Sequence, residues 1–500
     1  MQPAIWWSAL ILALGACVGS FLNVIIYRWP RNLLARSPLW SFCPRCGHTL
    51  AWHDNIPVLS CLWLGGRCRY CRGSISLQYP FVELACALLF LMVYDGFFVG
   101  RQRLGVADLS TDWPMLLAHW TLAAALLALA IMDLEAYMVD IRLTWIVAGA
   151  GLAAHSLWTP HTSLGPSAWI RPGATQAAIA AAAAAGLAIG AGLAALLAAG
   201  REKVEDRPHA GEAEGSAGLI APAAARPDDP TARPGPTGAH AAWWIVPPLL
   251  LVLAYAAAMQ WHPDMRPVAS SLLTYTADGR ILEPGEATDY GAIRLLAGAA
   301  VLFAALALAA GHPHPEEDAS ILETIEAEAG GARRIAAIEL LVISPAIILA
   351  VAAQMALTRW PALGQACESW LHARPVQAWA WQPLLGLATG LCGWILGGAV
   401  AWFARIFFTL AFGREALGMG DVHILAATGA VAGWVVAFLG FFVAAPLALL
   451  ALVVIRLRRQ ARALPYGPWL ALGFLVVVLF QDRILEYLNL RGLLDRAWAM

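Results

Sequence analysis

Four of the nine cysteines form two pairs with the same spacing inside one short segment: Cys43 and Cys46 in "CPRC", and Cys68 and Cys71 in "CRYC". Each Cys-x-x-Cys pair offers two thiolates from one tight turn, and two such turns complete the tetrahedral four-cysteine site typical of structural zinc. The alternative is four reduced thiols without a metal, although unliganded cysteines are more often single packing residues. We therefore predict a structural zinc ion on these four residues.

Two aspartates lie at the edges of long apolar runs: Asp133 in "IMDLEAYMVD" and Asp421 in "GMGDVH". Ionisable residues are costly at such positions and are by default functional candidates. Two carboxylates brought together share a proton, so that one activates water while the other polarises a carbonyl group. This is aspartic protease chemistry. The alternatives are that Asp421 only caps the following helix and that Asp133 is an interfacial charge that reaches water.

Two glycines, Gly418 and Gly420, precede the second aspartate, and His423 follows it two residues later. Glycine leaves room for an extended backbone to approach and adopts dihedral angles that other residues avoid. We therefore expect Gly418, Gly420 and His423 to belong to the active-site loop around Asp421, with the glycines opening it to a peptide substrate.

The elements that position these residues are apolar helices. The 500-residue chain is 60% hydrophobic and only 13% charged, and it contains repeated apolar runs of roughly 20 residues, the length that spans a bilayer as a helix. We predict an all-α polytopic membrane protein of about 12 transmembrane helices. The predicted spans are residues 3–27, 81–99, 114–132, 142–160, 174–199, 242–261, 293–311, 335–357, 382–410, 423–438, 439–455 and 468–480.

The orientation follows from the loop between the first two spans. Between Arg28 and Pro80 it contains seven arginines and a single acidic residue, Asp54, which marks it as cytosolic by the positive-inside rule. The reducing cytosol disfavours disulfides between its cysteines. Alternating the spans from an outside N-terminus brings Asp133 and Asp421 to the same cytosolic face.

Five regions are expected. They are a first transmembrane helix (1–27), a small cytosolic zinc-ribbon-like loop (28–80), a membrane core with the first aspartate (81–172), an inserted transmembrane module (173–381) and a membrane core with the second aspartate (382–500). Within the insert, residues 201–240 are rich in Pro, Gly, Ala and charge and predict a disordered linker. The insert has four predicted spans, and an even number returns the chain to the same side. We expect a module added to a complete catalytic core.

Four segments together resemble the bacterial type IV prepilin peptidase family. They are "GSFLNVIIYRWP" (19–30), "HDNIPVLSCLWLGGRCRYCRGSISLQYPFVEL" (53–84), "REALGMGDVHILAATGAVAGW" (414–434) and "LPYGPWLALG" (464–473). The resemblance implies an inner-membrane enzyme of GxGD type, with Asp133 and Asp421 as the catalytic pair and the four cysteines as zinc ligands. It also implies cleavage of prepilin and pseudopilin leaders after glycine on the cytosolic side. S-adenosylmethionine-dependent methylation of the new N-terminus would follow, although no residue for that cofactor can be assigned.

The chain departs from the family pattern in three places. His423 replaces the usual lysine, which leaves a cation there only when the imidazole is protonated. Met138 and Val139 replace the usual Leu-Pro before Asp140, so the start of the next helix is less rigidly set. The third departure is the insert of about 200 residues.

The expected function is therefore an intramembrane aspartic endopeptidase, and the resemblance implies a second activity as an N-methyltransferase. Its expected partners are prepilin or pseudopilin precursors and membrane lipid, with no nucleic acid. A different class of protein also fits the residues: a transporter or channel in which Asp133 and Asp421 relay ions. A further alternative is a degenerate family member that acts as an assembly scaffold.

Overall fold

The computed structural model describes residues 2–30, 40–100, 106, 108–158, 174–205, 238–260, 284–310, 331–371, 378–415, 417–457 and 465–488. Over these residues the protein is helical, with two isolated β-bridges in place of any strand. The all-α fold class predicted from the sequence is confirmed.

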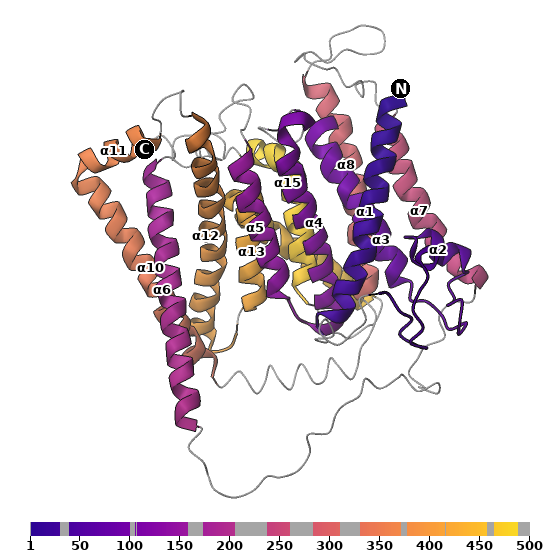
Figure 1. Ribbon diagram of the computed structural model, residues 1–500, viewed down its shortest axis with the longest axis horizontal. Coiled ribbons are helices and arrows are strands. Elements are labelled where there is room, and N and C mark those ends of the chain that lie inside the picture. The colour runs from indigo at the N-terminus through magenta and orange to yellow at the C-terminus, as the bar shows by residue number, and fades with distance from the viewer. Residues whose placement is uncertain are drawn as a thin grey trace, which may run out of the picture.

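The helices run roughly parallel and antiparallel to one another through one layer-like bundle (Figure 1). The first part of the core contains α1 (Gln2–Arg28), α3 (Gln78–Tyr94) with the π-helical turn η2 (Asp95–Val99), α4 (Leu109–Ala136) and α5 (Ile141–Leu157). The second part contains α12 (Ala378–Phe412), α13 (Met419–Ala432), α14 (Trp434–Leu457) and α15 (Gly467–Tyr487). Between them come α6 (Ala174–Glu205), α7 (Gly238–Gln260), α8 (Pro284–Ala310), α10 (Ala332–Arg359) and α11 (Pro361–Leu371).

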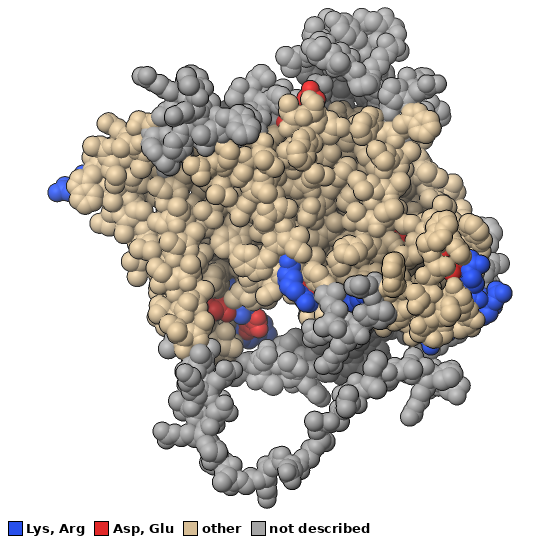
Figure 2. Space-filling view, in the orientation of Figure 1, with Lys and Arg blue, Asp and Glu red and all other residues tan. Residues whose placement is uncertain are grey.

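Length and composition identify a multi-pass membrane protein. Seven of the described helices are long and apolar enough to cross a bilayer, and five more are apolar but shorter. Figure 2 shows a broad uncharged band across the molecule, with the visible charged side chains near its margins. This is the surface expected for a bundle surrounded by lipid. The total of about 12 spans stays a prediction.

Small residues hold the centre of the core together. Helix α13 packs against α12, α5 and α14. At its closest approach to α12, a Cβ added to Gly429 would lie 2.1 Å from the Gly393 carbonyl oxygen. Such close backbone contact through small residues is a common way for helices to associate in lipid. It fixes α13, and the aspartate at its start, against the rest of the bundle.

The last part of the chain differs from the prediction in one boundary. Spans were expected at residues 423–438 and 439–455, but α13 ends at Ala432 and α14 begins at Trp434. The residue between them, Gly433, has a φ of 95°, a conformation that glycine adopts at little cost and that ends a helix. A glycine inside an apolar run gives no periodicity signal, so the break was placed too late.

The helices of the insert lie on two sides of the core. Helices α6, α10 and α11 pack with one another, and α6 and α10 also pack on α12, whereas α7 and α8 lie beside α1, α3 and α15 (Figure 1). The two groups of inserted helices therefore cover different flanks of the core. That the insert is a module added to a complete catalytic core stays a prediction. Of the predicted linker 201–240, residues 201–205 continue α6 and residues 238–240 begin α7. The remainder, 206–237, lies outside the described residues.

Candidate active site

Asp133 lies in the last turn of α4. The helix ends where Tyr137 adopts a left-handed conformation and its N–H donates to the Asp133 carbonyl oxygen. Asp133 is buried, with 8% of the residue exposed, and its Oδ2 accepts a hydrogen bond of 2.9 Å from the backbone N–H of Gly467. The start of α15 therefore fixes this carboxylate from a position 334 residues later in the chain.

Asp421 lies in the first turn of α13, three residues after the N-cap Gly418. Its own N–H donates to the Gly418 carbonyl oxygen at 3.2 Å. The alternative that Asp421 is the cap of this helix is therefore wrong, because the cap position belongs to a glycine. The aspartate is buried, so the fold encloses a carboxylate that has no capping function.

The two aspartates lie close enough for their charges to interact. Helix α4 packs against both α13 and α15. Tyr466 and Gly467, where α15 begins, lie near Asp421 and Asp133 respectively. Gly467 contacts Asp133. Burial and the nearby Asp421 carboxylate raise the pKa of Tyr466 to about 12, and the Tyr466 hydroxyl donates to the Phe441 carbonyl oxygen at 3.1 Å. Tyr466 is therefore a neutral phenol beside the pair at physiological pH.

The two glycines of the GMGD segment have different surroundings. A Cβ on Gly420 would lie 2.5 Å from the Cβ of Val139, so this glycine is required by packing against the chain between α4 and α5. Gly418 is exposed, and a Cβ there would meet nothing closer than Asp421 Oδ2 at 3.5 Å. Of the two, only Gly418 has the open surroundings expected for approach of a substrate backbone.

His423 is half-buried on α13, two residues after Asp421. Two residues correspond to a rotation of about 200° around a helix, so the two residues start from opposite sides of α13. The charged groups that act on Asp421 are Asp133, Arg405 and Glu415. The positive charge among these groups is therefore that of Arg405 in α12, and not that of His423.

The start of α5 is fixed without the proline that the family pattern has there. Asp140 is the N-cap of α5, and its Oδ1 accepts from the Arg142 N–H at 2.9 Å. Burial alone would raise the pKa of Asp140, but the hydrogen bonds and charge of Arg142 outweigh burial and lower it. The Arg142 guanidinium also lies 4.6 Å from the Trp29 ring, just after α1. This contact brings the end of α1 to the end of the bundle that holds the aspartates.

The cysteines of the 28–80 loop converge. Their four Sγ atoms all lie within 4.8 Å of one another, and Cys43 Sγ is 4.0 Å from Cys71 Sγ. Ligands about 2.3 Å from a tetrahedral zinc are about 3.8 Å apart, so the cluster fits a metal ion. Burial raises the pKa of the Cys43 thiol to about 12. A bound cation would replace the thiol protons, so the four converging sulfurs suit a metal ion such as zinc.

The two cysteine turns have matching backbones. In one, Cys43 N–H donates to His48 O and Gly47 N–H to Cys43 O; in the other, Cys68 N–H donates to Gly73 O and Arg72 N–H to Cys68 O. Paired knuckles of this kind present two sulfurs each from the same geometry.

The loop is attached to the membrane core by polar contacts. The helical pieces η1 (Trp52–Asn55) and α2 (Leu59–Trp63) lie between the knuckles. Glu83 of α3 accepts a 2.6 Å hydrogen bond from the Val58 N–H. The Arg69 guanidinium is 2.7 Å from Asp54 Oδ1 and so links the second knuckle to η1. The loop is thus a small folded unit at the same end of the bundle as the aspartates.

Arg405, Glu339, Tyr466 and Gly467 were not singled out in the sequence. Arg405 and Glu339 carry a signal that could have found them, since each is an ionisable residue inside an apolar helix. Tyr466 and Gly467 carry none by residue type, because a tyrosine and a glycine before a helix are ordinary.

The comparisons with known proteins agree with the resemblance. The family model for the bacterial peptidase A24 N-terminal domain matches residues 13–97, which contain the cysteine loop. A prepilin leader peptidase/N-methyltransferase of Myxococcus xanthus is 41% identical over 150 residues, which are 29% of this chain and 40% of that protein. Another, of Klebsiella pneumoniae, is 37% identical over 155 residues, 30% of this chain and 62% of that protein.

A third relative of the same name, from Vibrio cholerae, is 35% identical over 135 residues, 26% of this chain and 48% of that protein. The matched part therefore covers less than two thirds of each of these relatives. No solved structure matches the chain.

Proposed function

We propose a function from the premise that the chain is a member of the type IV prepilin peptidase family, to which its N-terminal domain and its relatives point. The protein is an aspartic endopeptidase of the bacterial inner membrane. It cleaves the leader peptides of prepilins or pseudopilins after glycine, with its active site facing the cytosol. The observation that carries the proposal is the approach of Asp133 and Asp421 from α4 and α13.

The chemistry needs one ionised and one protonated carboxyl group. The ionised aspartate takes a proton from water, and the water oxygen attacks the carbon of the scissile carbonyl. The protonated aspartate donates its proton to the carbonyl oxygen as the tetrahedral intermediate forms. When the C–N bond breaks, the leaving amine takes the proton that the first aspartate removed from water. One hydroxyl of the tetrahedral intermediate gives its proton back to the second aspartate as the carboxylic acid product forms, so the pair again holds one proton. The Gly467 N–H orients Asp133 throughout.

Two further assignments complete the proposal. Cys43, Cys46, Cys68 and Cys71 would hold a structural zinc ion, which supplies rigidity to the loop and takes no part in hydrolysis because its four positions are filled by sulfur. The names of the relatives also support a second activity, as an N-methyltransferase. We propose that it methylates the new N-terminus with S-adenosylmethionine as the methyl donor. We assign no residues to it.

The pair is tested by replacing each aspartate with asparagine. Asp133→Asn and Asp421→Asn should each abolish cleavage of a peptide with a Gly-Phe leader junction, while leaving the amount of membrane-inserted protein unchanged. Asparagine keeps the shape but can neither accept nor donate the proton. Cleavage by purified protein in detergent, followed by mass spectrometry, is the measurement.

The matched control is Asp112→Asn, because Asp112 is a buried aspartate at the other end of α4, where its Oδ1 accepts from Trp158. The control should cleave. Substantial cleavage by either pair variant would rule out the two-aspartate mechanism, and a wild-type protein that moves ions but cuts nothing would favour the transporter.

A further inference from the structure

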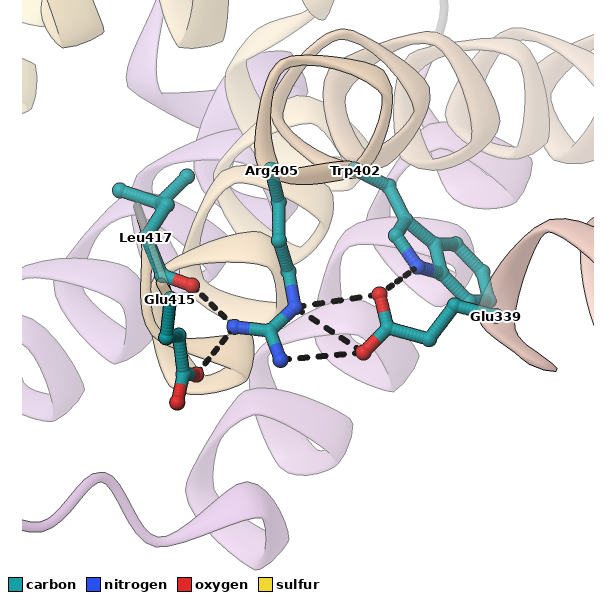
Figure 3. Close-up of polar contacts among 5 residues, drawn as sticks. All are labelled: Glu339, Trp402, Arg405, Glu415 and Leu417. Atoms are coloured by element: carbon teal, nitrogen blue, oxygen red, sulfur yellow. Dashed lines mark hydrogen bonds and ion pairs between the residues drawn. The ribbon is translucent and has the colours of Figure 1, made fainter. Parts of the chain in front are cut away.

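A buried arginine connects an inserted helix to the loop that carries Asp421. Arg405 of α12 has a side chain that is 8% exposed, and its partner Glu339 of α10 has one that is 11% exposed. Arg405 Nε donates to both carboxylate oxygens of Glu339 at 3.1 Å, and its Nη2 donates to Oε1 at 3.0 Å (Figure 3). Trp402 Nε1 donates to Glu339 Oε2 at 3.1 Å. Glu339 is therefore held on both oxygens.

The remaining nitrogen of the same guanidinium faces the catalytic segment. Arg405 Nη1 donates to Glu415 Oε1 and to the carbonyl oxygen of Leu417, as Figure 3 shows on the side opposite Glu339. Leu417 immediately precedes Gly418, the N-cap of α13, and Asp421 follows in its first turn. A single planar cation thus bridges α10 and the start of α13, a geometry that the fixed fork of arginine allows and that lysine does not reproduce.

A second contact from α10 reaches the same loop. Gly413, which follows α12, has a φ of 70°, and a Cβ there would lie 3.2 Å from the guanidinium nitrogens of Arg333. Arg333 lies in the first turn of α10. The segment between α12 and α13 is therefore linked to α10 near both of its ends. Gly413 lies beside Arg333 of α10, and Leu417 is bound by Arg405, which Glu339 of α10 holds.

We propose, on the basis of the function above, that α10 is part of the catalytic machinery: Glu339 holds Arg405, and Arg405 positions the Leu417–Asp421 segment and supplies a positive charge near the aspartate pair. Glu339 and Arg405 are positioning residues. The inserted region thereby contributes to the active site through its packing on α12. The charges that meet at this point are Arg405, Glu339, Glu415, Asp421 and Asp133.

The test compares Glu339→Gln with a matched control, Asp95→Asn. Asp95 of η2 forms a similarly buried pair with Arg294 of α8, 2.9 Å apart, which also joins an inserted helix to the core. Both changes keep side-chain shape and remove one negative charge from a buried pair. We expect Glu339→Gln to lower kcat for leader cleavage about tenfold or more with KM little changed, since small misplacement of reacting groups is costly. Asp95→Asn should leave kcat of the folded protein unchanged.

Two further measurements make the outcome decisive. Arg405→Lys should retain more activity than Arg405→Met, because lysine keeps the charge but not the bidentate contact. Hydrogen exchange of residues 413–421 should accelerate in Glu339→Gln and not in Asp95→Asn, and this readout does not depend on cleavage.

Unchanged kcat and unchanged exchange in Glu339→Gln would overturn the proposal. If the wild-type protein cuts no leader peptide, the proposed function fails, and the exchange experiment alone decides whether α10 holds the loop. If Arg405→Met does not fold, the proposal is decided by Glu339→Gln, which keeps the side-chain shape, together with Arg405→Lys.

Discussion

At the scale of single residues, two positions in the candidate site must be glycine because a neighbouring side chain fills the space that a Cβ would occupy. Gly420 leaves room for Val139, and Gly467 leaves room for the carboxylate of Asp133. In each case the neighbour comes from a different part of the chain. A sequence reader can see that a glycine stands beside a candidate aspartate, but which side chain fills the space is decided by packing.

Gly467→Ala should strongly reduce cleavage. A Cβ at this position would lie 2.6 Å from Asp133 Oδ2, so the carboxylate must move away from the backbone N–H that orients it. A loss on the order of 100-fold in kcat is expected from a displacement of this kind. Gly149→Ala on α5 is the control, since an added Cβ there meets nothing within 4 Å. Equal rates for the two variants would show that the Gly467 contact does not orient Asp133.

The sequence singles out the four cysteines and the two aspartates as candidates because their signal is local. A repeated Cys-x-x-Cys spacing and a carboxylate in an apolar run are visible within a few residues. The Glu339–Arg405 pair spans 66 positions, and its formation depends on which faces of α10 and α12 meet. Nothing in either helix alone specifies that register.

At the scale of elements, the cysteine loop is a small folded unit built around four converging sulfur atoms. Its two knuckles are joined to each other by converging sulfurs and to the core by Glu83 and Val58. The loop has little apolar interior of its own, so a metal would supply much of its stability.

Purified protein should contain one zinc ion per chain, and the double change Cys43→Ser and Cys46→Ser should remove it. Metal analysis measures the first, and faster limited proteolysis within residues 40–77 reports the loss of loop structure. Cys367→Ser is the control, because Cys367 lies in α11 away from the cluster. Protein prepared without chelator that contains no zinc would contradict the assignment. Because a four-cysteine zinc is structural, the rate of leader cleavage should fall only to the extent that loss of the metal unfolds the loop.

Helix boundaries show where sequence periodicity stops being informative. Most spans were predicted within a few residues because apolar runs end in charge or proline. The boundary at Gly433 was missed because α13 and α14 are apolar on both sides of it. Helix α11 was missed because its 11 residues are too short to cross a bilayer and too apolar to stand out from the preceding span.

At the scale of the whole molecule, the insert is divided between two flanks with different relations to the site. Helices α6 and α10 lie against α12, and α10 reaches the loop before α13. Helices α7 and α8 lie against α3, η2 and α15, where Tyr255 and Arg294 contact Asp95. The two flanks should therefore respond differently to deletion.

Removing α7 and α8 should preserve cleavage. The deletion joins the end of α6 to the start of α10 through a Gly/Ser linker. The two helices already pack together, and losing an even number of spans keeps the orientation of everything downstream. Asp95→Asn is included so that no unpaired buried charge remains. Cysteine labelling of loops on both faces checks insertion. A correctly inserted but inactive protein would show that this flank also contributes to the site.

The separation of 334 positions between Asp133 and Gly467 also sets the order in which the parts of the candidate site are made during synthesis. At typical translation rates, roughly 20 to 70 seconds separate the two residues on the ribosome. Throughout that interval the first aspartate is already in the membrane without the backbone group that orients it, and the second has not been made for most of it. Under the proposed function, a nascent chain therefore has no complete catalytic pair until α15 is made.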